Sequence, residues 1–297
     1  MINVIILYGG DSIESEISRQ SARGIIENID QSKFSATTQD INDFDVKSFN
    51  REAVVFIAVH GKDGEDGKTQ KLLSKNNIKY TGSNEISTKK CWDKISSKIL
   101  MIENEIPTPE FQVVGKKEKL NLNNEFFKRN KSFFVKPNNN GSSFGVSKVD
   151  RKKNLEEAIS EARKYSDNVI IEKAYNHAEY TVGILKGEAL TPLEIIAEDE
   201  KGFYNYEAKY LSKATKKVEV VDEEIKDELK KIALKAFYAH GCQTWGRVDF
   251  VFDGKNLGVL EINTVPGFTE KSLFPLAAKL SGINYQELIT NIIEDSI

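Results

Sequence analysis

Hydrophobic and polar residues in the first part of the chain alternate in the manner of strands joined by helices. Two continuous apolar runs occupy residues 2–7 and 53–59. Residues 67–76 have a helical pattern, and residues 78–83 have that of a short strand. Isoleucines between the two apolar runs recur at near-helical spacing, at Ile13, Ile17, Ile25 and Ile29. Continuous apolar strands joined by helices predict an α/β fold with a parallel sheet that is buried on both faces.

The residues that follow the two apolar runs predict a ligand-binding edge. Gly9 and Gly10 follow the first run, His60 follows the second, and Glu14 lies shortly after the glycines. Ligands of parallel α/β sheets bind beyond the carboxyl ends of the strands. We therefore expect these four residues to lie on one functional edge.

The middle of the chain changes to shorter elements. Residues 84–104 predict a single helix that begins at Ser83 or Asn84 and ends before a Pro-Thr-Pro linker at 107–109. The Lys-rich stretch 115–131 is interpreted as a surface linker and helix rather than as a binding patch. Short strands are expected at 132–136, 145–149 and 168–173, with a helix near 153–165.

The last part of the chain has longer strands and no regular alternation with helices. A charged helix is expected at about 222–239, and two further helices close the chain. The expected strands are 179–185, 189–196, 244–252 and 256–263. The pattern shows no internal repeat. It indicates an α+β arrangement in this part of an otherwise α/β protein.

Composition favours a globular protein of two or three domains. The chain has 297 residues, of which 39% are apolar and 29% charged. A formal net charge of -3 argues against a nucleic-acid binder, which usually carries a basic face. The two cysteines, Cys91 and Cys242, lack metal-type spacing and fit a reducing cytoplasm. Two of the three histidines, His177 and His240, lack a partner motif, so we expect them to be structural or exposed.

The apolar segments also bear on export and membranes. The N-terminus lacks the basic flank and the longer apolar core of a signal peptide. Its apolar run is far shorter than the roughly 20 residues that a membrane span needs. We therefore expect neither export nor a membrane partner.

A glycine- and serine-rich segment, KPNNNGSSFG at residues 136–145, predicts a phosphate-binding loop. It lies between two strand-like segments, so several of its backbone N–H groups can face phosphate oxygens. Gly141 and Gly145 permit close approach, and Lys136 supplies a positive charge. No Gly-Lys-Ser or Gly-Lys-Thr closes the segment, so it is not a Walker A loop. A flexible polar turn is the alternative interpretation.

The segment 246–263 predicts a metal site on a β-hairpin, because an Asp-Gly-Lys-Asn turn joins two apolar strands. Period-two alternation puts Arg247 and Asp249 on one face. Glu261 and Asn263 share a face of the partner strand, with Glu261 within about one rung of Asp249. Two carboxylates and an amide are hard oxygen ligands that suit magnesium, and carboxylates this close repel each other without a cation. A solvated sheet face with ordinary charge pairing is the alternative.

Three further segments carry weaker signals. Residues 169–182 can offer backbone hydrogen bonds and apolar walls to adenine, although a plain domain crossover is the simpler interpretation. The aromatic segment 202–212 is either an ordered lid that shields a reactive intermediate or an unrecognised strand. Residues 263–275 place Ser272 near the start of a helix whose N–H groups can hold a substrate carboxylate, with simple helix capping as the alternative.

Taken in order, these segments resemble the D-alanine–D-alanine ligase family of the ATP-grasp superfamily. The match covers nearly the whole chain and consists of GGDSIESEIS, HGKDGEDG, YTGS with a following DK, VKPNNNGSSFGVSKV, EKAYNHAEYTV, YNYEAKY, WGRVDF and EINTVPGFTEKSL. The resemblance implies a three-domain ATP-grasp architecture. It consists of a Rossmann-like domain at 1–93, a central domain at 94–178, and a C-terminal domain with the metal site at 179–297. ATP is implied to bind between the latter two.

The resemblance also implies which residues bind ATP and metal. Lys94 and Lys136 would contact the phosphates, and Lys209 would reach the terminal phosphate from the lid. The full implied nucleotide set is Lys94, Lys136, Ser142, Ser143, Gly145, Glu172, Lys173, Ala174, Tyr175, Glu179, Tyr204 and Lys209. The implied metal ligands are Asp249, Glu261 and Asn263. They would hold two magnesium ions, with manganese or potassium as further possible cations.

A substrate pocket and a mechanism follow from the same resemblance. The implied pocket residues are Glu14, His60, Tyr210, Arg247, Gly267, Ser272 and Leu273. The implied catalytic residues are Glu14, Ser142, Tyr210, Arg247 and Ser272. A hydrogen-bonded trio of Glu14, Ser142 and Tyr210 would orient the first substrate, while Arg247 and the Gly267 amide would stabilise an oxyanion. One D-alanine carboxylate would attack the γ-phosphate of ATP, and the amine of a second would attack the acyl phosphate.

The expected protein is therefore a cytoplasmic homodimer that serves peptidoglycan precursor synthesis. The sequence EAKY, which includes Tyr210, resembles the dipeptide-forming members of the family. A D-alanine–D-lactate ligase and another ATP-grasp carboxylate–amine ligase are the alternatives within this class. A non-catalytic nucleotide-binding protein on the same fold is the alternative outside it.

Overall fold

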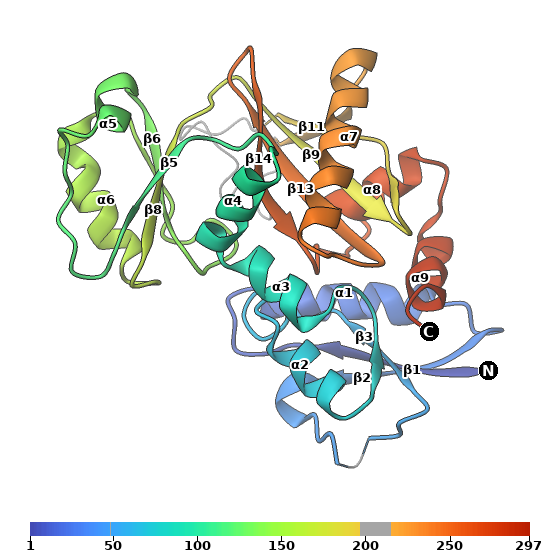
Figure 1. The fold of residues 1–297 in the computed structure, drawn as a ribbon. Helices are drawn as coiled ribbons and strands as arrows, with labels where there is room; N and C mark the ends of the chain where they lie inside the picture. The colour runs from blue at the N-terminus through green and yellow to red at the C-terminus, as the bar shows by residue number, and fades with distance from the viewer. Residues whose placement is uncertain (48, 197–214) are drawn as a thin grey trace.

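The strands of the protein form three separate sheets, one built from the N-terminal residues and two from the later part of the chain (Figure 1). The computed structural model describes residues 1–47, 49–196 and 215–297. The three sheets carry helices on their outer faces and approach one another around helices α3 (Glu85–Trp92) and α4 (Lys94–Glu103). The predicted mixture of α/β and α+β organisation is confirmed.

The N-terminal sheet is four-stranded and parallel, in the order β2-β1-β3-β4. Its strands are β1 (Ile2–Tyr8), β2 (Phe34–Asp40), β3 (Val54–Ile57) and β4 (Lys79–Tyr80). Its helices are α1 (Ser15–Asn28) and α2 (Lys68–Lys75), with a short 3-10 turn at Ile41–Asp43. All four residues of β3 are buried, as its continuous apolar run predicted. The sequence did not reveal β2, in which Phe34 alone is buried.

The prediction of a single helix over residues 84–104 is wrong, because the chain turns at Asp93 between α3 and α4. Asp93 has an extended backbone, with φ −84° and ψ 99°. Its carboxylate accepts the N–H of Ser96 at 2.8 Å and so caps α4. Its other oxygen accepts the side-chain amide of Asn138 at 2.8 Å. The break therefore connects the start of α4 to the glycine- and serine-rich segment.

The central sheet is four-stranded and antiparallel, in the order β5-β8-β6-β7. Its strands are β5 (Phe111–Val114), β6 (Phe133–Pro137), β7 (Ser147–Val149) and β8 (Val169–Lys173). Helices α5 (Glu125–Arg129) and α6 (Leu155–Ala162) cover one side, and a 3-10 turn at Lys152–Asn154 precedes α6. A separate apolar cluster that includes Phe126, Phe127 and Phe133 holds this unit together.

The C-terminal sheet has the order β12-β11-β9-β13-β14, with β10 paired to β9. Its strands are β9 (Ala178–Leu185), β10 (Glu188–Ala189), β11 (Leu193–Ile196), β12 (Lys216–Glu219), β13 (Trp245–Phe252) and β14 (Leu257–Asn263). Helices α7 (Glu223–Ala239), α8 (Leu273–Leu280) and α9 (Tyr285–Glu294) complete this part. The strand expected at 189–196 is interrupted around Pro192, because proline has no N–H for a sheet ladder.

The first and last parts of the chain share one apolar core. Phe56 of β3 packs against Trp245 of β13, with ring centroids 6.0 Å apart. Helix α9 lies beside α1, and its buried leucine and isoleucines belong to the same cluster as the N-terminal sheet (Figure 1). The N-terminal and C-terminal parts are therefore packed against each other. The boundaries 1–93, 94–178 and 179–297 stay a prediction.

Candidate active site

Two adjoining cavities open where the three parts of the chain meet. We call them the large cavity, of about 770 Å³, and the narrow cleft. The large cavity lies between the N-terminal residues and the loop after β14, and the narrow cleft lies between the central and C-terminal sheets. Both are lined by Lys94, Asn140, Gly141, Ser142 and Glu261. The two cavities therefore share one wall.

The structure brings most of the predicted site residues to these two cavities. Those that line the narrow cleft are Lys94, Lys136, Ser142, Ser143, Glu179, Asp249 and Glu261. Those that line the large cavity are Glu14, His60, Lys94, Ser142, Arg247, Glu261, Asn263, Gly267, Ser272 and Leu273. Gly145, Glu172, Lys173, Ala174 and Tyr175 line neither cavity. Tyr204, Lys209 and Tyr210, together with the rest of the predicted lid, lie outside the described residues.

The glycine- and serine-rich segment connects β6 and β7, which form the predicted antiparallel hairpin. Ser142, Ser143 and Gly145 have φ values of 50°, 61° and 72°, so the turn uses the left-handed region repeatedly. A Cβ on Gly145 would lie 2.6 Å from the ring of Tyr165, which explains why glycine occupies this position. Successive N–H groups in such a turn can form a concave anion-binding surface.

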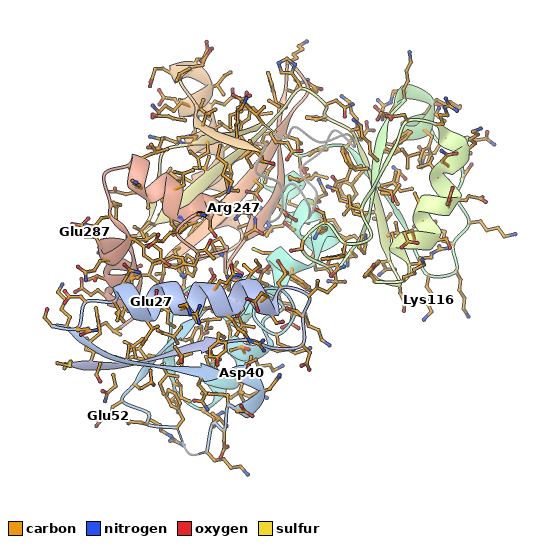
Figure 2. The ribbon with its side chains drawn as sticks, turned by 180° about the vertical axis from the view of Figure 1, so that it is seen from behind. Glu27, Asp40, Glu52, Lys116, Arg247 and Glu287 are labelled. Carbon is orange, nitrogen blue, oxygen red and sulfur yellow. The ribbon has the colours of Figure 1, made fainter. Side chains whose placement is uncertain are left out.

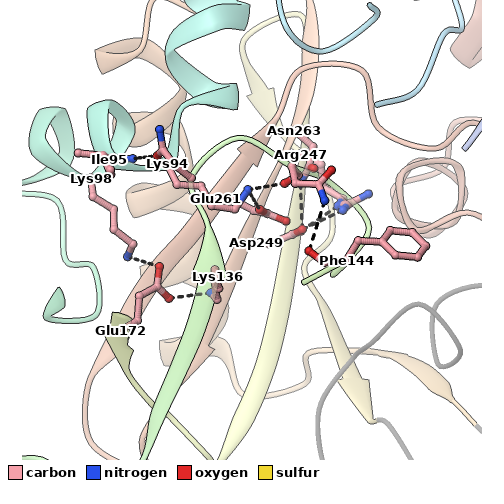
Figure 3. Close-up of polar contacts among 12 residues, drawn as sticks. Lys94, Ile95, Lys98, Lys136, Phe144, Glu172, Arg247, Asp249, Glu261 and Asn263 are labelled. Carbon is pink, nitrogen blue, oxygen red and sulfur yellow. Dashed lines mark hydrogen bonds and ion pairs between the residues drawn. The ribbon is translucent and has the colours of Figure 1, made fainter. Parts of the chain in front are cut away.

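Helix α4 anchors this turn. The Lys94 ammonium donates a hydrogen bond to the carbonyl oxygen of Asn140 at 2.8 Å. The N–H of Ile95 donates to the side-chain oxygen of Asn138 at 2.9 Å (Figure 3). The predicted phosphate loop is thereby fixed against a helix N-terminus, which itself favours anions.

Lys136 extends from β6 toward the narrow cleft and is held from behind by Glu172. The ammonium of Lys136 lies 2.7 Å from one carboxylate oxygen of Glu172, and Lys98 lies 3.3 Å from the other (Figure 3). Burial tends to raise the pKa of Glu172, but Lys136 and Lys98 outweigh it and keep that pKa below its usual value. Glu172 is therefore an ionised carboxylate inside the protein, behind a cationic group of the cleft.

The predicted hairpin of metal-type ligands is formed by β13 and β14. Asp249 pairs directly with Glu261 in the register, and Arg247 pairs with Asn263, with a β-bulge just after Asp249. The turn closes with the N–H of Asp253 donating to the carbonyl oxygen of Asn256 at 3.2 Å. Arg247 and Asp249 share a face while Val248 and Phe250 are buried on the other, as the alternation predicted.

The oxygen atoms on this hairpin form a polar network. Asp249 accepts hydrogen bonds from Arg247 through both carboxylate oxygens, at 2.8 Å each. It also accepts from the hydroxyl of Thr181 at 2.6 Å and from the amide of Asn263 at 2.9 Å. Glu261 lies 3.5 Å from the Lys94 ammonium (Figure 3). Each of these two carboxylates thus has a cationic neighbour, as expected for two acidic groups at adjacent positions.

The segment predicted to surround adenine runs from the end of β8 into β9. Lys173 lies 3.0 Å from Asp253 and 4.8 Å from the centre of the Tyr175 ring. Ala174 is buried, and Glu179, the second residue of β9, lines the narrow cleft. The segment therefore connects the central sheet to the turn of the β13–β14 hairpin.

In the large cavity, Glu14 and Ser142 meet across two parts of the chain. The Ser142 hydroxyl donates a short hydrogen bond to the Glu14 carboxylate. Glu14 lies just before helix α1, and Ser142 lies in the turn after β6. Two members of the predicted trio are therefore in contact, and the third, Tyr210, is not among the described residues.

His60 connects the N-terminal sheet to the loop after β14. Its ring bonds the Ser21 hydroxyl at 2.9 Å and the Val265 carbonyl at 3.1 Å. Burial lowers the pKa of His60, so its ring is neutral at pH 7. The other two histidines agree with the expectation of structural roles. His240 bonds Ser97 and Ala236 inside the protein, and His177 packs edge-on against Phe252.

The loop after β14 presents Gly267 and Ser272 to the large cavity. Ser272 is the N-cap residue of α8, but its hydroxyl forms no side-chain cap of that helix. It accepts instead the N–H of Thr269 at 3.0 Å. The start of α8 at Ser272 and Leu273 therefore lines the large cavity without a side-chain cap from Ser272, which argues against the capping alternative.

Three residues in or behind these cavities were not singled out from the sequence. Glu65 lines the large cavity, and burial together with the nearby Glu14 raises its pKa to about 8. Lys217 lines the same cavity and donates to the Lys271 carbonyl at 2.8 Å. Lys98 lies behind the narrow cleft. The acidic pair in HGKDGEDG was a usable signal for Glu65, whereas nothing local in the sequence marks Lys98 or Lys217.

Comparison with solved structures defines the class of protein. A D-alanine–D-alanine ligase from Bacillus anthracis superposes with a TM-score of 0.90 at 32% identity, over 100% of this chain and 97% of that one. A second structure of the Bacillus anthracis ligase, complexed with ATP, gives 0.87 at 30% identity, over 100% and 97% of the two chains. The VanG D-Ala:D-Ser ligase from Enterococcus faecalis gives 0.84 at 26% identity, over 100% and 99%. The fold is the ATP-grasp fold, and the protein is an enzyme of the ligase class.

Sequence relatives define the family. Residues 100–294 match the family model for the D-ala D-ala ligase C-terminus. A D-alanine–D-alanine ligase from Methylacidiphilum infernorum is 37% identical, over 99% of this chain and 95% of the relative. One from Buchnera aphidicola is 35% identical, over 98% of each. The chain belongs to the D-alanine–D-alanine ligase family. Among its described helices, none has both the length and the apolar character of a membrane span.

Proposed function

We propose that this enzyme joins two molecules of D-alanine to D-alanyl-D-alanine at the expense of ATP, in the synthesis of peptidoglycan precursors. The observation that carries the proposal is the shared wall of the two cavities. On one side the narrow cleft is lined by Ser142 and Ser143 of the phosphate-type turn, and on the other by Asp249 and Glu261. Because the large cavity adjoins it, a nucleotide and two small substrates can meet there.

The reaction balances as two substitutions. A carboxylate oxygen of the first D-alanine attacks the γ-phosphorus of ATP, and the bond from that phosphorus to the bridging oxygen breaks to release ADP. The amine of the second D-alanine then attacks the acyl carbon, loses a proton, and expels inorganic phosphate. A carboxylate is a poor acyl donor until phosphate replaces one of its oxygens as the leaving group. Exclusion of water is therefore essential at this stage.

The residues of the chain act through position and charge. Lys94 and Lys136 attract the phosphates, and the Glu14–Ser142 hydrogen bond orients the first D-alanine. Arg247 and the Gly267 amide stabilise the oxyanion of the tetrahedral intermediate. The Ser272 hydroxyl and the Leu273 N–H hold the carboxylate of the second D-alanine. Neutral His60 braces this pocket.

The oxygen donors of the hairpin fit magnesium. Asp249, Glu261 and Asn263 offer two carboxylates and an amide on adjacent positions of β13 and β14. Among the described residues, no group of three or more His, Cys, Asp and Glu side chains could hold a metal ion, so the amide completes this set. Two magnesium ions held there would neutralise charge on the phosphate oxygens. Manganese as a substitute for magnesium, and assistance by potassium, are further parts of the proposal.

The other nucleotide contacts are part of the proposal. Lys173, Ala174, Tyr175 and Glu179 would surround the base and ribose, with Glu172 behind Lys136. Gly145 would let the phosphate turn close. Tyr204, Lys209 and Tyr210 would contribute from the segment outside the described residues.

The second substrate is the finer point of the proposal. The structural likeness to a D-Ala:D-Ser ligase shows that the fold also occurs in a ligase named for a different second substrate. The EAKY sequence, with Tyr210, supports D-alanine for this chain.

Location and assembly complete the proposal. Cys91 and Cys242 are free thiols with sulfur atoms 3.6 Å apart, which suits the reducing cytoplasm. A homodimer rests on the resemblance alone, and light scattering of the purified protein tests it.

The decisive experiment is ADP release by the purified enzyme with D-alanine, with and without magnesium. We expect release that requires both. D-Lactate and D-serine, each added together with D-alanine, test the second site, and mass spectrometry identifies the product. A preference for D-lactate or D-serine would replace the proposed second substrate. Nucleotide binding without any D-alanine-dependent turnover would instead support a non-catalytic nucleotide-binding protein.

A further inference from the structure

A second lysine shares the buried carboxylate behind the narrow cleft. The ammonium of Lys98, from helix α4, lies 3.3 Å from the Oε1 atom of Glu172, and Lys136 lies 2.7 Å from Oε2 (Figure 3). The side chains of Lys98, Glu172 and Lys136 are 1%, 2% and 9% exposed. We call these three residues the buried cluster. It lies beside the site already described but lines neither cavity except through Lys136.

The sheet places the two lysines on either side of Glu172. In the register of the central sheet, Glu172 of β8 pairs with Phe111 of β5 and with Phe134 of β6. The Lys98 ammonium lies 5.6 Å from the centre of the Phe111 ring, and the Lys136 ammonium lies 5.7 Å from that of Phe134. Each lysine therefore has its own aromatic neighbour and its own oxygen of one carboxylate.

The charges of the buried cluster do not cancel. Two ammonium groups and one carboxylate leave one formal positive charge. Burial lowers the pKa of Lys98 to about 8, against the opposing effect of Glu172, so Lys98 is still charged at pH 7. A carboxylate paired with Lys136 alone would neutralise it. Because Lys98 shares the carboxylate of Glu172, the buried cluster as a whole keeps a net positive charge on the side where Lys136 lines the cleft.

Lys98 also connects the two sheets that form the cleft. Its ammonium donates to the hydroxyl of Thr108 at 2.6 Å, and that hydroxyl donates to the Val259 carbonyl at 2.8 Å. Val259 lies on β14, and its own N–H donates to the Pro107 carbonyl at 2.7 Å. The chain of contacts from β8 through Lys98 to β14 therefore ties the cationic side of the cleft to the strand that carries Glu261.

We propose that Lys98 is a positioning residue for the nucleotide: it holds Glu172 by one oxygen, leaves the buried cluster with a net positive charge beside the cleft, and fixes this arrangement to β14 through Thr108. The proposal rests on the proposed ATP site. Its direct readout is nucleotide binding, which is measurable whether or not D-alanine is turned over.

The test is a double-mutant cycle on the full chain, with the Kd of ATP in excess magnesium measured by titration calorimetry. Lys98→Met is expected to raise the Kd about tenfold to a hundredfold, the usual effect of losing a hydrogen bond to a charged group. The same substitution in a Glu172→Gln background is expected to change the Kd less than about threefold, because Lys136 no longer has a carboxylate to neutralise it. Lys98→Arg is expected to restore binding to within a few-fold of the original protein.

Controls separate this role from a merely structural one. Lys116→Met removes an exposed lysine of the same part of the chain, paired with Asp167 at 2.9 Å, and should leave the Kd unchanged. Steady-state kinetics of Lys98→Met should show a raised KM for ATP with an unchanged KM for D-alanine. A lowered melting temperature with an unchanged Kd would overturn the proposal, as would equal effects of Lys98→Met in the two backgrounds.

Thr108→Val keeps the test decisive where Lys98→Met does not fold. It preserves both charges and removes the hydroxyl that fixes the Lys98 ammonium, so a Kd raised a few-fold is expected. An unchanged Kd for Thr108→Val would count against the proposal. A protein that binds ATP but never releases ADP would refute the proposed function and leave this inference intact.

Discussion

The two groups of charged residues beside the narrow cleft are built differently. The buried cluster of Lys98, Glu172 and Lys136 has side chains that are at most 9% exposed. The open cluster, which we define as Lys94, Arg247, Asp249, Glu261 and Asn263, has charged side chains that are 12–25% exposed and line the cavities (Figure 3). Both lie on sheet strands and on α4, so secondary structure does not explain the difference.

The difference in exposure indicates different roles for the two clusters. In the buried cluster, the low polarity of the surroundings strengthens each ion pair, so that loss of one partner destabilises the fold strongly. Such a cluster keeps its geometry when a ligand arrives. In the open cluster, water and the cleft compete for each carboxylate, so its members can exchange a lysine or an arginine for a phosphate or a metal ion. Arg247 lines the large cavity, and the view from behind in Figure 2 shows it above helix α1.

The strongest test of this comparison is stability. Glu172→Gln leaves two buried ammonium groups without their carboxylate, so the free energy of unfolding should fall by about 3–5 kcal/mol. Asp249→Asn, its counterpart in the open cluster, should cost clearly less because Arg247 can turn to water. Urea unfolding of both variants at pH 7 checks this. Equal decreases in the free energy of unfolding of the two variants would show that the exposure of the charged side chains does not determine how much each cluster stabilises the fold.

The next largest effect is expected on turnover. Glu261→Gln removes a carboxylate of the open cluster, and kcat should fall about 10²–10³-fold, the usual effect of losing one group that stabilises developing charge. Its melting temperature should stay close to that of the original protein. Coupled ADP-release kinetics measure the first quantity and calorimetry the second. Near-normal turnover would contradict the metal assignment of Glu261.

The open cluster was largely predictable from the sequence. Residues that alternate with apolar ones, such as Arg247 and Asp249, must share a face of their strand, and a short turn fixes the register that pairs Asp249 with Glu261. The predicted glycine-serine hairpin was confirmed for the same reason. Local spacing therefore determines what a hairpin brings together.

The buried cluster was not predictable in this way. Lys98 lies on a helical face that also carries Ser97 and Met101, and its partner Glu172 is distant in the sequence. Only tertiary packing brings them together. Edge strands β2 and β12 were missed because their polar and charged residues lack the apolar pattern of a central strand. The break at Asp93 was missed because both helices continue one helical pattern.

The carboxyl group of Glu65 extends the comparison, because it lies in the large cavity near a second acidic residue, Glu14. The pKa of Glu65 is about 8, above its usual 4.5. The folded protein therefore binds a proton that the unfolded chain releases, and stability should fall as pH rises from about 4.5 to about 8. Glu65→Gln should remove this part of the pH dependence. At pH 8 the free energy of unfolding of Glu65→Gln should exceed that of the original protein by on the order of 1–3 kcal/mol, since one pKa unit is worth about 1.4 kcal/mol.

Urea unfolding of Glu65→Gln at pH 5 and pH 8 makes this measurement, with Glu52→Gln, at an exposed glutamate, as a matched control. Parallel pH profiles for Glu65→Gln and the original protein would mean that Glu65 is ionised in the fold. Glu65 would then belong with the open cluster rather than between the two.

The smallest effect is expected at the turn of the β13–β14 hairpin. Asp253 pairs with Lys173 at 3.0 Å, and its pKa is lowered to about 2, because N–H groups at Asn256 and Lys255 and the Lys173 ammonium outweigh burial. A lowered folded pKa gives stability that is full above about pH 4 and lost as pH falls through about 2. Asp253→Asn keeps an oxygen for the turn and should cost less than about 1 kcal/mol at pH 7, as for other ion pairs near the surface. Raising the salt from about 0.1 M to 1 M, which shortens the screening length from about 10 Å to 3 Å, should remove most of that loss. A loss of stability as large as that of Glu172→Gln, and insensitive to salt, would mean that the Lys173–Asp253 pair behaves as a buried one. The distinction between the buried cluster and more exposed ion pairs would then not hold at the hairpin.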